Sequence, residues 1–370
     1  MDYRIFAQSV FSGELVLENQ LITCANGIVQ RIEPGEAGSA NVAVENIAPG
    51  FFDIQVNGGA SFHFTAKPDE ESIADIDKAC LHDGTAYVLP TLITSSFENI
   101  FRGIDAVRNY KKKNKYTGVL GMHLEGPFIN PEKRGAHLKK YIQQPNRKQV
   151  EELLKYSDGI IVQITVAPEM LDRETLELLL HSGVSVSLGH SNASYAEAAS
   201  AFNLGINQVT HLFNAMSPFL HRAPGVVGAV FDNAEVFAPI VLDGKHIDYA
   251  TARIAHKIKK DKLFLISDAL FLGREKQSFQ WEEFDAQLLN DEYLNSDGNL
   301  AGASISLAEA VRNAIEQLDI SVQEAVEMAT VRPAEVMGMA NKIGKIKAGY
   351  PARFTVFDKR NRNFRVLTAQ

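Results

Sequence analysis

Short apolar runs alternate with amphipathic stretches through the middle of the chain. Amphipathic helical patterns separate most of the runs, and three of these helices are predicted to open with Ser-x-x-Glu capping boxes at Ser194, Ser306 and Ser321. Strands that alternate with helices are typical of a parallel sheet. The eight runs are FFDIQVNG (51–58), AYVLPTLI (86–93), TGVLGMHLEG (117–126), IIVQITVAPE (160–169), VSVSLGH (184–190), QVTHLFNA (208–215), VFAPIVLDG (236–244) and LFLISDA (263–269).

Eight strand–helix units in about 290 residues predict an α/β fold, a (β/α)8 barrel of the TIM type. A doubly wound open sheet is the alternative. Such a sheet normally carries a glycine-rich phosphate-binding turn after its first strand, and DIQVNGGASF does not match one. The barrel is therefore the favoured interpretation.

The two ends of the chain have a different pattern of hydrophobic and polar residues from the middle. Residues 1–47 and 341–370 contain short, broken β patterns interrupted by Gly, Asn and Pro. Each end is too short to bury a core alone, so we expect both to pair in a small β-sandwich domain beside a barrel of residues 48–340. Residues 271–299 are polar and poorly periodic, which favours a flap on a loop after the eighth strand, with a disordered insertion as the alternative.

Composition excludes several classes of function. The formal net charge of −8 and the pI of about 5.7 argue against a nucleic-acid partner. No apolar stretch is long enough for a membrane span, and MDYRIFAQSV lacks the pattern of a signal peptide, so we expect a cytoplasmic protein with no membrane partner. The two cysteines, Cys24 and Cys80, exclude a disulfide framework and suit a reducing compartment.

Polar side chains gather where the predicted strands end. In a (β/α)8 barrel the carboxyl ends of all strands meet at one mouth, where catalytic groups lie. A lone histidine at a strand end is more often structural, but several polar groups at equivalent ends indicate a site. These strand-end residues are Gln55, Asn57, Glu125, His190, His211 and Asp268.

Three of these residues form a ligand set for a divalent cation. One carboxylate and two imidazoles, Glu125, His190 and His211, leave one position open, which is the pattern of a catalytic zinc ion; Fe²⁺, Co²⁺ or Mn²⁺ could use the same donors. Asp268 is a candidate for a fourth ligand or a general base. His123 shares a strand face with Glu125, so it either supports the ligands or fills a polar layer inside the barrel.

A series of motifs resembles a known family. The segments HLEGPF, LGHS, THLFNAM, LDGKHID and LISDA, in this order, are similar to those of the amidohydrolase superfamily, and within it to the N-acetylglucosamine-6-phosphate deacetylases. The resemblance extends over nearly the whole chain. It implies hydrolysis of the substrate acetamide to glucosamine 6-phosphate and acetate in amino-sugar catabolism, by a homodimer with one divalent metal ion per subunit.

The resemblance also implies roles for individual residues. Glu125, His190 and His211 would bind the metal, Asp268 would act first as base and then as acid, and His137 would stabilise negative charge on the substrate carbonyl. Arg222 would reach the phosphate across the dimer interface, although an arginine on a loop is often only a surface ion-pair partner. The implied substrate contacts are Ala136, His137, Asn214, Ala215, Arg222, Asp243, His246, Leu300, Ala301 and Gly302.

Two features depart from the family pattern. Gln55 and Asn57 stand where many members of the superfamily carry His-x-His for a second metal, so we expect one metal ion, with Gln55 near its open side. The bulky run Leu270-Phe271-Leu272 is expected to reshape the acyl or sugar pocket. Two alternatives remain: deacetylation of another N-acyl compound, such as N-acetylgalactosamine 6-phosphate, or a barrel that has lost catalysis.

Overall fold

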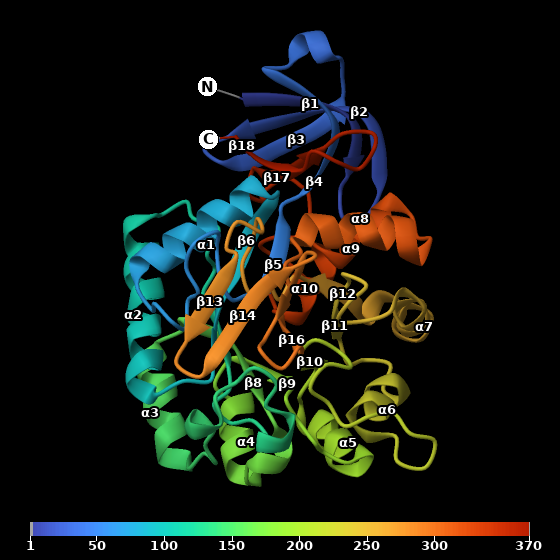
Figure 1. Cartoon of the computed structure of the whole chain (residues 1–370). Helices are drawn as coiled ribbons and strands as arrows, with labels where there is room; N and C mark the ends of the chain where they lie inside the picture. Colours follow the sequence, from blue (N-terminus) through green and yellow to red (C-terminus); the bar gives the residue numbers. More distant parts are fainter. Residues whose placement is uncertain (1–2, 370) are drawn as a thin grey trace.

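A computed structural model describes residues 3–369 and contains the predicted barrel. All eight predicted strands form at the expected places, and helices α1 to α8 follow them in turn around the outside (Figure 1). The strands are β5 (Phe51–Val56), β6 (Thr85–Ile93), β7 (Met122–Glu125), β8 (Ile161–Val166), β9 (Ser185–Leu188), β10 (Gln208–Val209), β11 (Ala238–Val241) and β12 (Leu263–Ile266). The helices are α1 (Glu70–His82), α2 (Phe97–Lys113), α3 (Arg147–Ser157), α4 (Arg173–Leu180), α5 (Tyr195–Leu204), α6 (Gly225–Asp232), α7 (Tyr249–Lys259) and α8 (Leu307–Leu318), with α9 (Val322–Met328) and α10 (Val331–Val336) after them.

The strands close into a cylinder through parallel pairing. Strands β5 to β10 form one sheet in sequence order, and β11 pairs with β12. Parallel bridges join the two pieces, Gln208 with Phe237 on one side and Val56 with Ala269 on the other. The carboxyl ends of the strands therefore meet at one mouth.

Side-chain caps define where the helices begin. Ser194 and Ser306 form the predicted capping boxes with Glu197 and Glu309. Ser321 also caps its helix, but the side chain of Glu324 turns away to His256 and Arg332.

The barrel has an apolar wall and a polar interior layer. Apolar side chains of the strands pack against the surrounding helices in one large core. Inside the cylinder, His123 lies 3.3 Å from the Thr91 hydroxyl and 2.8 Å from that of Thr165, which in turn contacts Thr210. His123 thus belongs to a polar layer inside the barrel, which was one of the two predicted roles. Its hydrogen bonds go to threonines and not to the candidate ligands.

Both ends of the chain build the small β domain. Its strands are β1 (Tyr3–Phe11), β2 (Val16–Ala25), β3 (Ile28–Pro34), β4 (Val42–Pro49), β17 (Arg353–Phe357) and β18 (Arg365–Thr368), in the order β18-β17-β4-β1-β2-β3. A bridge between Ile28 and Pro351 joins the two sides of this curled sheet around a separate apolar core. The predicted domain limits, 47/48 and 340/341, stay a prediction.

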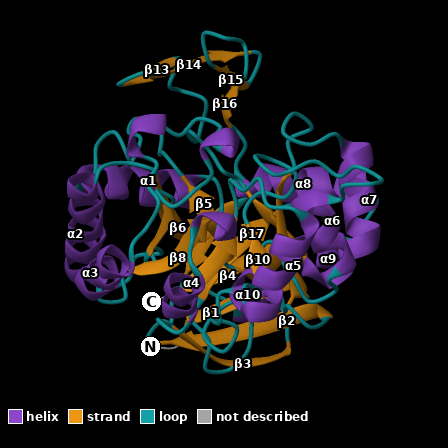
Figure 2. Ribbon diagram, turned by 90° about the horizontal axis from the view of Figure 1, so that it is seen from below, coloured by secondary structure: helices purple, strands orange, loops and turns teal. Residues whose placement is uncertain are grey.

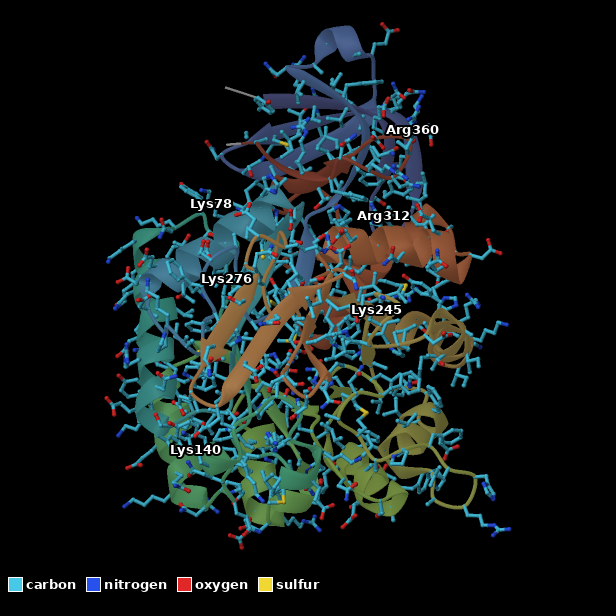
Figure 3. The ribbon with its side chains drawn as sticks, in the orientation of Figure 1. Lys78, Lys140, Lys245, Lys276, Arg312 and Arg360 are labelled. Atoms are coloured by element: carbon cyan, nitrogen blue, oxygen red, sulfur yellow. The ribbon has the colours of Figure 1, made fainter. Side chains whose placement is uncertain are left out.

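The segment predicted as a flap is folded. Four antiparallel strands, β13 (Ser278–Trp281), β14 (Phe284–Leu289), β15 (Glu292–Leu294) and β16 (Leu300–Gly302), stand at the end of the barrel away from β1 to β3 (Figure 2). Lys140 lies beside the tip of the β13–β14 hairpin, 2.6 Å from Glu282 and 2.8 Å from Glu283 (Figure 3). Lys245, from the loop between β11 and α7, forms an ion pair with Glu292 of β15.

Candidate metal centre and active site

Strand ends place the chemical groups at the barrel mouth. Glu125 is the last residue of β7, and His190, His211 and Asp268 each lie two residues beyond β9, β10 and β12. At these three positions the backbone turns into the left-handed region, with φ of 47° at His190, 30° at His211 and 49° at Asp268. Such conformations are uncommon outside glycine and concentrate at functional sites, where they aim a side chain that a regular strand would direct elsewhere.

The three candidate ligands converge on one point. Glu125 Oε1 lies 3.2 Å from His190 Nε2 and 3.0 Å from His211 Nε2, and the two Nε2 atoms are 3.1 Å apart. Tetrahedral zinc ligands, each bound at about 2.0–2.1 Å, lie about 3.3 Å from one another. All three side chains are buried. Their spacing therefore fits one small divalent cation.

The second nitrogen of each ligand histidine supports the same interpretation. His190 Nδ1 lies 2.8 Å from the Lys133 carbonyl, and His211 Nδ1 lies 3.2 Å from the Asn214 carbonyl. A carbonyl only accepts, so each Nδ1 carries a proton, and each Nε2 is the atom that would bind a cation in place of its hydrogen bond to Glu125 Oε1. Burial raises the pKa of Glu125, but the hydrogen bonds and charges of the two histidines outweigh it and hold the pKa well below its usual range.

His137 lies next to these ligands but has the opposite tautomer. Its Nε2 is 3.8 Å from Glu125 Oε2, and Glu125, His137 and His190 also have ligand atoms within 4.8 Å of one another. The backbone N–H of Thr94 donates to His137 Nδ1 at 3.4 Å, and the Thr94 hydroxyl is 2.7 Å away. Nδ1 is therefore an acceptor, and Nε2–H is left as a donor toward the cavity. Burial, followed by the charge of His190, lowers the pKa of His137 well below its usual value, which keeps the ring neutral.

Asp268 is linked to the candidate ligand Glu125 through Gln55. Gln55 Nε2 donates to Asp268 Oδ1 at 3.0 Å and Asn57 Nδ2 donates at 2.9 Å. Gln55 Nε2 also lies 3.0 Å from Glu125 Oε1, so it links the two carboxylates; its place at the open side of a metal ion stays a prediction. Burial and then the charge of Glu125 raise the pKa of Asp268 above its ordinary value, which favours proton uptake by this carboxylate.

A cavity of about 220 Å³ is lined by the three candidate ligands, by His137 and Asp268, and by most of the predicted substrate contacts. Two predicted contacts are not among the residues that line it. Arg222 is exposed on the loop before α6, and Asp243 holds His246, whose Nδ1 is 2.7 Å from Asp243 Oδ2. The predicted contacts that line the cavity are Ala136, His137, Asn214, Ala215, His246, Leu300, Ala301 and Gly302.

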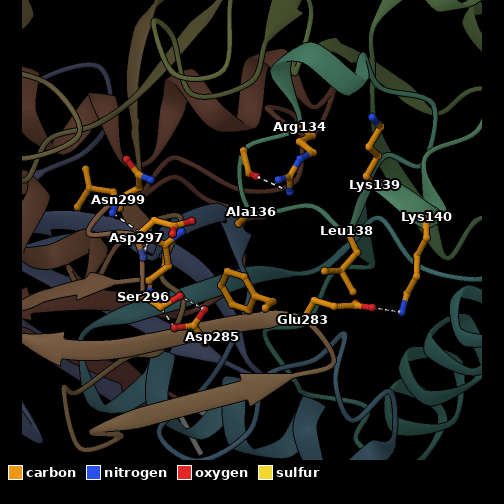
Figure 4. A pocket seen from close by; sticks show the side chains of 15 residues that line it. Arg134, Ala136, Leu138, Lys139, Lys140, Glu283, Asp285, Ser296, Asp297 and Asn299 are labelled. Atoms are coloured by element: carbon orange, nitrogen blue, oxygen red, sulfur yellow. Dashed lines mark hydrogen bonds and ion pairs between the residues drawn. The ribbon is translucent and has the colours of Figure 1, made fainter.

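A second cavity of about 570 Å³ adjoins the first beneath the flap (Figure 4). Ala136, Leu300 and Ala301 line both cavities. Arg134 and Lys139 come from the loop after β7, whereas Asp285 and Asn299 come from the flap. The flap thus forms part of the wall of the candidate site.

Several residues of the cavity wall are not among the predicted substrate contacts. His63, Ile93, Leu270 and Phe284 line the cavity with the predicted residues. The bulky run after Asp268 pointed to Leu270, and its position in the wall agrees with the expected change of pocket shape. Phe284 comes from the flap, whose polar sequence carries no signal that marks this one side chain.

Comparison with known proteins identifies the family. The sequence model of the Amidohydrolase family matches residues 46–369. The chain belongs to the amidohydrolase family. Its cluster of metal-competent side chains therefore occurs in a family that is metal-dependent.

Several relatives of this chain are amino-sugar phosphate deacetylases. The N-acetylglucosamine-6-phosphate deacetylase of Haemophilus influenzae is 32% identical over 366 residues, which cover 96% of this chain and 95% of the relative. The N-acetylgalactosamine-6-phosphate deacetylase of a Shewanella species is 34% identical, with 87% and 82% covered. The crystal structure of N-acetylglucosamine-6-phosphate deacetylase from Pasteurella multocida is 32% identical with a TM-score of 0.92, over 100% of this chain and 98% of that one.

Proposed function

We propose that this enzyme hydrolyses the acetamide of N-acetylglucosamine 6-phosphate and releases glucosamine 6-phosphate and acetate in amino-sugar catabolism. The observation that carries the proposal is the convergence of Glu125, His190 and His211 opposite Asp268 and His137 in one cavity. The similarity to N-acetylglucosamine-6-phosphate deacetylases, at 32% identity over nearly the full length, supports the same substrate.

The metal centre belongs to the proposal. Glu125, His190 and His211 would hold one divalent ion per subunit; Zn²⁺ suits two imidazoles and a carboxylate, and Fe²⁺, Co²⁺ or Mn²⁺ could take the same donors. When bound, such an ion lowers the pKa of water to about 7 and polarises a carbonyl. Gln55 is a poor cation ligand and occupies the adjoining position, which supports a single ion.

The surrounding residues would move protons and stabilise charge. Asp268 takes a proton from the attacking water and later delivers it to the amine nitrogen, which leaves poorly unless it is protonated. His137 Nε2–H donates to the carbonyl oxygen as negative charge develops there. His246 and Asn214 line the same cavity and are suited to bind the sugar phosphate.

Dimer formation would complete the phosphate site. Arg222 is exposed on a loop with Phe219 and Leu220, which are 58% and 54% exposed. An apolar surface of this kind around a cation is suited to a second copy of the chain, with Arg222 reaching the partner's phosphate. A cytoplasmic location is also part of the proposal, supported by two buried, free cysteines. No helix among residues 3–369 is both long and apolar enough to span a membrane.

Acetate release from N-acetylglucosamine 6-phosphate tests the proposal. Asp268→Asn keeps the shape of the side chain and an acceptor for Gln55 and Asn57, but it cannot carry the proton. We expect turnover to fall by at least about a hundredfold, the scale of a general-base contribution. Elemental analysis serves as the control, because the variant should retain the same metal content as the wild type.

The same assay separates the alternatives. Acetate release from N-acetylgalactosamine 6-phosphate at the higher rate would favour the second substrate, for which the Shewanella relative is a precedent. Release from unphosphorylated sugars at equal rates would contradict the phosphate-binding role. A wild type without bound metal and without turnover would leave the non-catalytic barrel as the better interpretation.

A further inference from the structure

His63 lines the active-site cavity, but its side chain makes no hydrogen bond to any residue that the structure describes. It lies on the short turn after β5, where it forms an antiparallel bridge with Gly58. Its side chain is buried, with 2% of the residue exposed. Neither ring nitrogen has a hydrogen-bond partner among residues 3–369. Buried polar groups in native proteins are almost always hydrogen-bonded, so this ring calls for a physical explanation.

Two phenylalanines fix the orientation of the ring. Phe279 of the flap stacks on His63 at a centroid distance of 5.0 Å and an interplanar angle of 21°. Phe271 approaches edge-on at 6.0 Å and 64°. If the ring only filled space, a phenyl group would do so without the cost of desolvating two nitrogens. The packing thus holds an unpaired hydrogen-bonding group in a set orientation at the cavity wall.

A second unpaired polar atom lies near it. Asn57 Nδ2 donates a hydrogen bond to Asp268, whereas Asn57 Oδ1 is buried with no hydrogen-bond partner in the described part of the chain. Asn57 and His63 both line the cavity, and Gly58, the bridge partner of His63, directly follows Asn57. Two residues with unpaired polar atoms therefore line the same cavity as Asp268, and one of them, Asn57, donates directly to that carboxylate.

We propose that His63, together with Asn57 Oδ1, binds a sugar hydroxyl on a carbon next to the one that bears the amide. The inference rests on the proposed function, because Asp268 has to approach the amide nitrogen, and hydroxyls on the flanking carbons, C1 and C3, come nearest to it. A neutral imidazole offers one donor and one acceptor, which matches a hydroxyl. Burial lowers the pKa of His63 to about 3, which agrees with a neutral ring.

The proposal makes His63 a specificity-determining residue. A site that is built to bind a hydroxyl rejects an analogue without it, because the protein groups are then left unpaired. The flap contributes to this recognition through Phe279, which stacks on His63 and holds the ring that would contact the sugar.

Three substrates and two enzymes test the proposal. His63→Phe keeps the ring shape and removes both nitrogens. With N-acetylglucosamine 6-phosphate, we expect this variant to lose about tenfold in kcat/KM, the size of one or two neutral hydrogen bonds. With the C1-deoxy or the C3-deoxy analogue, whichever lacks the recognised hydroxyl, wild type and variant should be equal. The other analogue should show the full tenfold difference and so identifies the carbon.

Two outcomes would overturn the proposal: an equal loss with all three substrates, which would indicate a structural role, or no loss with the parent substrate. His63→Gln retains a donor and an acceptor and should recover part of the lost kcat/KM, while circular dichroism and metal content verify the fold of both variants. Failure of the proposed function is distinguishable, because it would appear as a wild type that releases no acetate. In that case, calorimetric binding of the parent and deoxy sugars to Asp268→Asn, with and without His63→Phe, still decides the role of His63.

Discussion

Individual residues at the barrel mouth carry conformational and electrostatic costs. The left-handed backbone at His190, His211 and Asp268 costs on the order of 1–3 kcal/mol per residue. Burial of Glu125 and Asp268 in one cavity adds repulsion, which raises the pKa of Asp268 after the effect of burial itself. A bound cation would offset part of this repulsion.

The sequence reveals residues such as these because their positions in strands are regular. Glu125, His190, His211 and Asp268 all lie at or just beyond the end of an apolar run, and parallel strands bring such ends together. His63 carries no such signal. Its role depends on the turn after β5 and on Phe279, which is more than two hundred residues away in the chain.

Asp53 allows a prediction about pH and stability. This carboxyl lies inside β5, and burial raises its pKa to about 7, although hydrogen bonds from Ser267 and Gln55 act in the opposite direction. In the unfolded chain the pKa is about 3.9. Between these values the folded protein holds a proton that the unfolded chain has released, so the stability contribution of Asp53 falls as pH rises, by up to about 1.4 kcal/mol per pH unit.

Thermal unfolding of the wild type and Asp53→Asn tests whether the stability contribution of Asp53 falls as pH rises. The variant is neutral at every pH and keeps an oxygen acceptor. The difference in Tm, wild type minus variant, should become more negative from pH 5 to pH 8. A constant difference would mean that Asp53 is charged throughout the range.

At the scale of elements, the flap shows how a polar segment can still fold. Two alternate positions of β14 are buried, Phe284 and Ala286, and they join Leu138 and Phe271 in a small apolar core. An amphipathic pattern this short and interrupted is hard to separate from an irregular loop in the sequence, which is why disorder was a real alternative. The partner surface, which includes Leu138, comes from a distant segment, and only the tertiary structure brings it into contact.

The apolar contacts should hold the flap more strongly than its ion pairs. Lys140 lies at the surface with its partners Glu282 and Glu283, and because solvent screens such ion pairs, their loss should change local opening little. Truncation of a buried phenylalanine costs about 3–5 kcal/mol. Hydrogen exchange of residues 278–302 should therefore accelerate at least tenfold in Phe284→Ala and less than fivefold in Lys140→Ala. Equal acceleration of exchange in both variants would mean that the ion pairs hold the flap as strongly as the apolar contacts do.

At the scale of the whole molecule, the β domain and the barrel share a buried interface. The Thr355 hydroxyl of β17 accepts from the Phe51 backbone N–H at 3.0 Å and donates to the Gly84 carbonyl at 2.8 Å. Phe364 packs on Phe51 with ring centroids 5.8 Å apart. Thr355 thus joins a terminal strand to the first barrel strand and to the turn before the second.

Thr355→Val should weaken this connection. The variant keeps the shape but leaves the Phe51 N–H and the Gly84 carbonyl buried without this partner, at a cost of about 1–3 kcal/mol. We expect a lower Tm in calorimetry, whereas Thr355→Ser, which keeps the hydroxyl, should lose less. A single transition that shifts as a whole would indicate that both parts unfold together; an unchanged Tm would contradict the role of this hydroxyl.

The sequence by itself determined the eight strand–helix units, the pairing of the two chain ends and the four residues at the centre of the candidate site. Each depends on local periodicity or on a regular strand end, and both are visible in the order of residues. The tertiary structure alone decided the tautomer of His137, the position of His63 against the flap, and the placement of Arg222 outside the cavity. These features depend on contacts between segments far apart in the chain, for which local patterns carry no distance information.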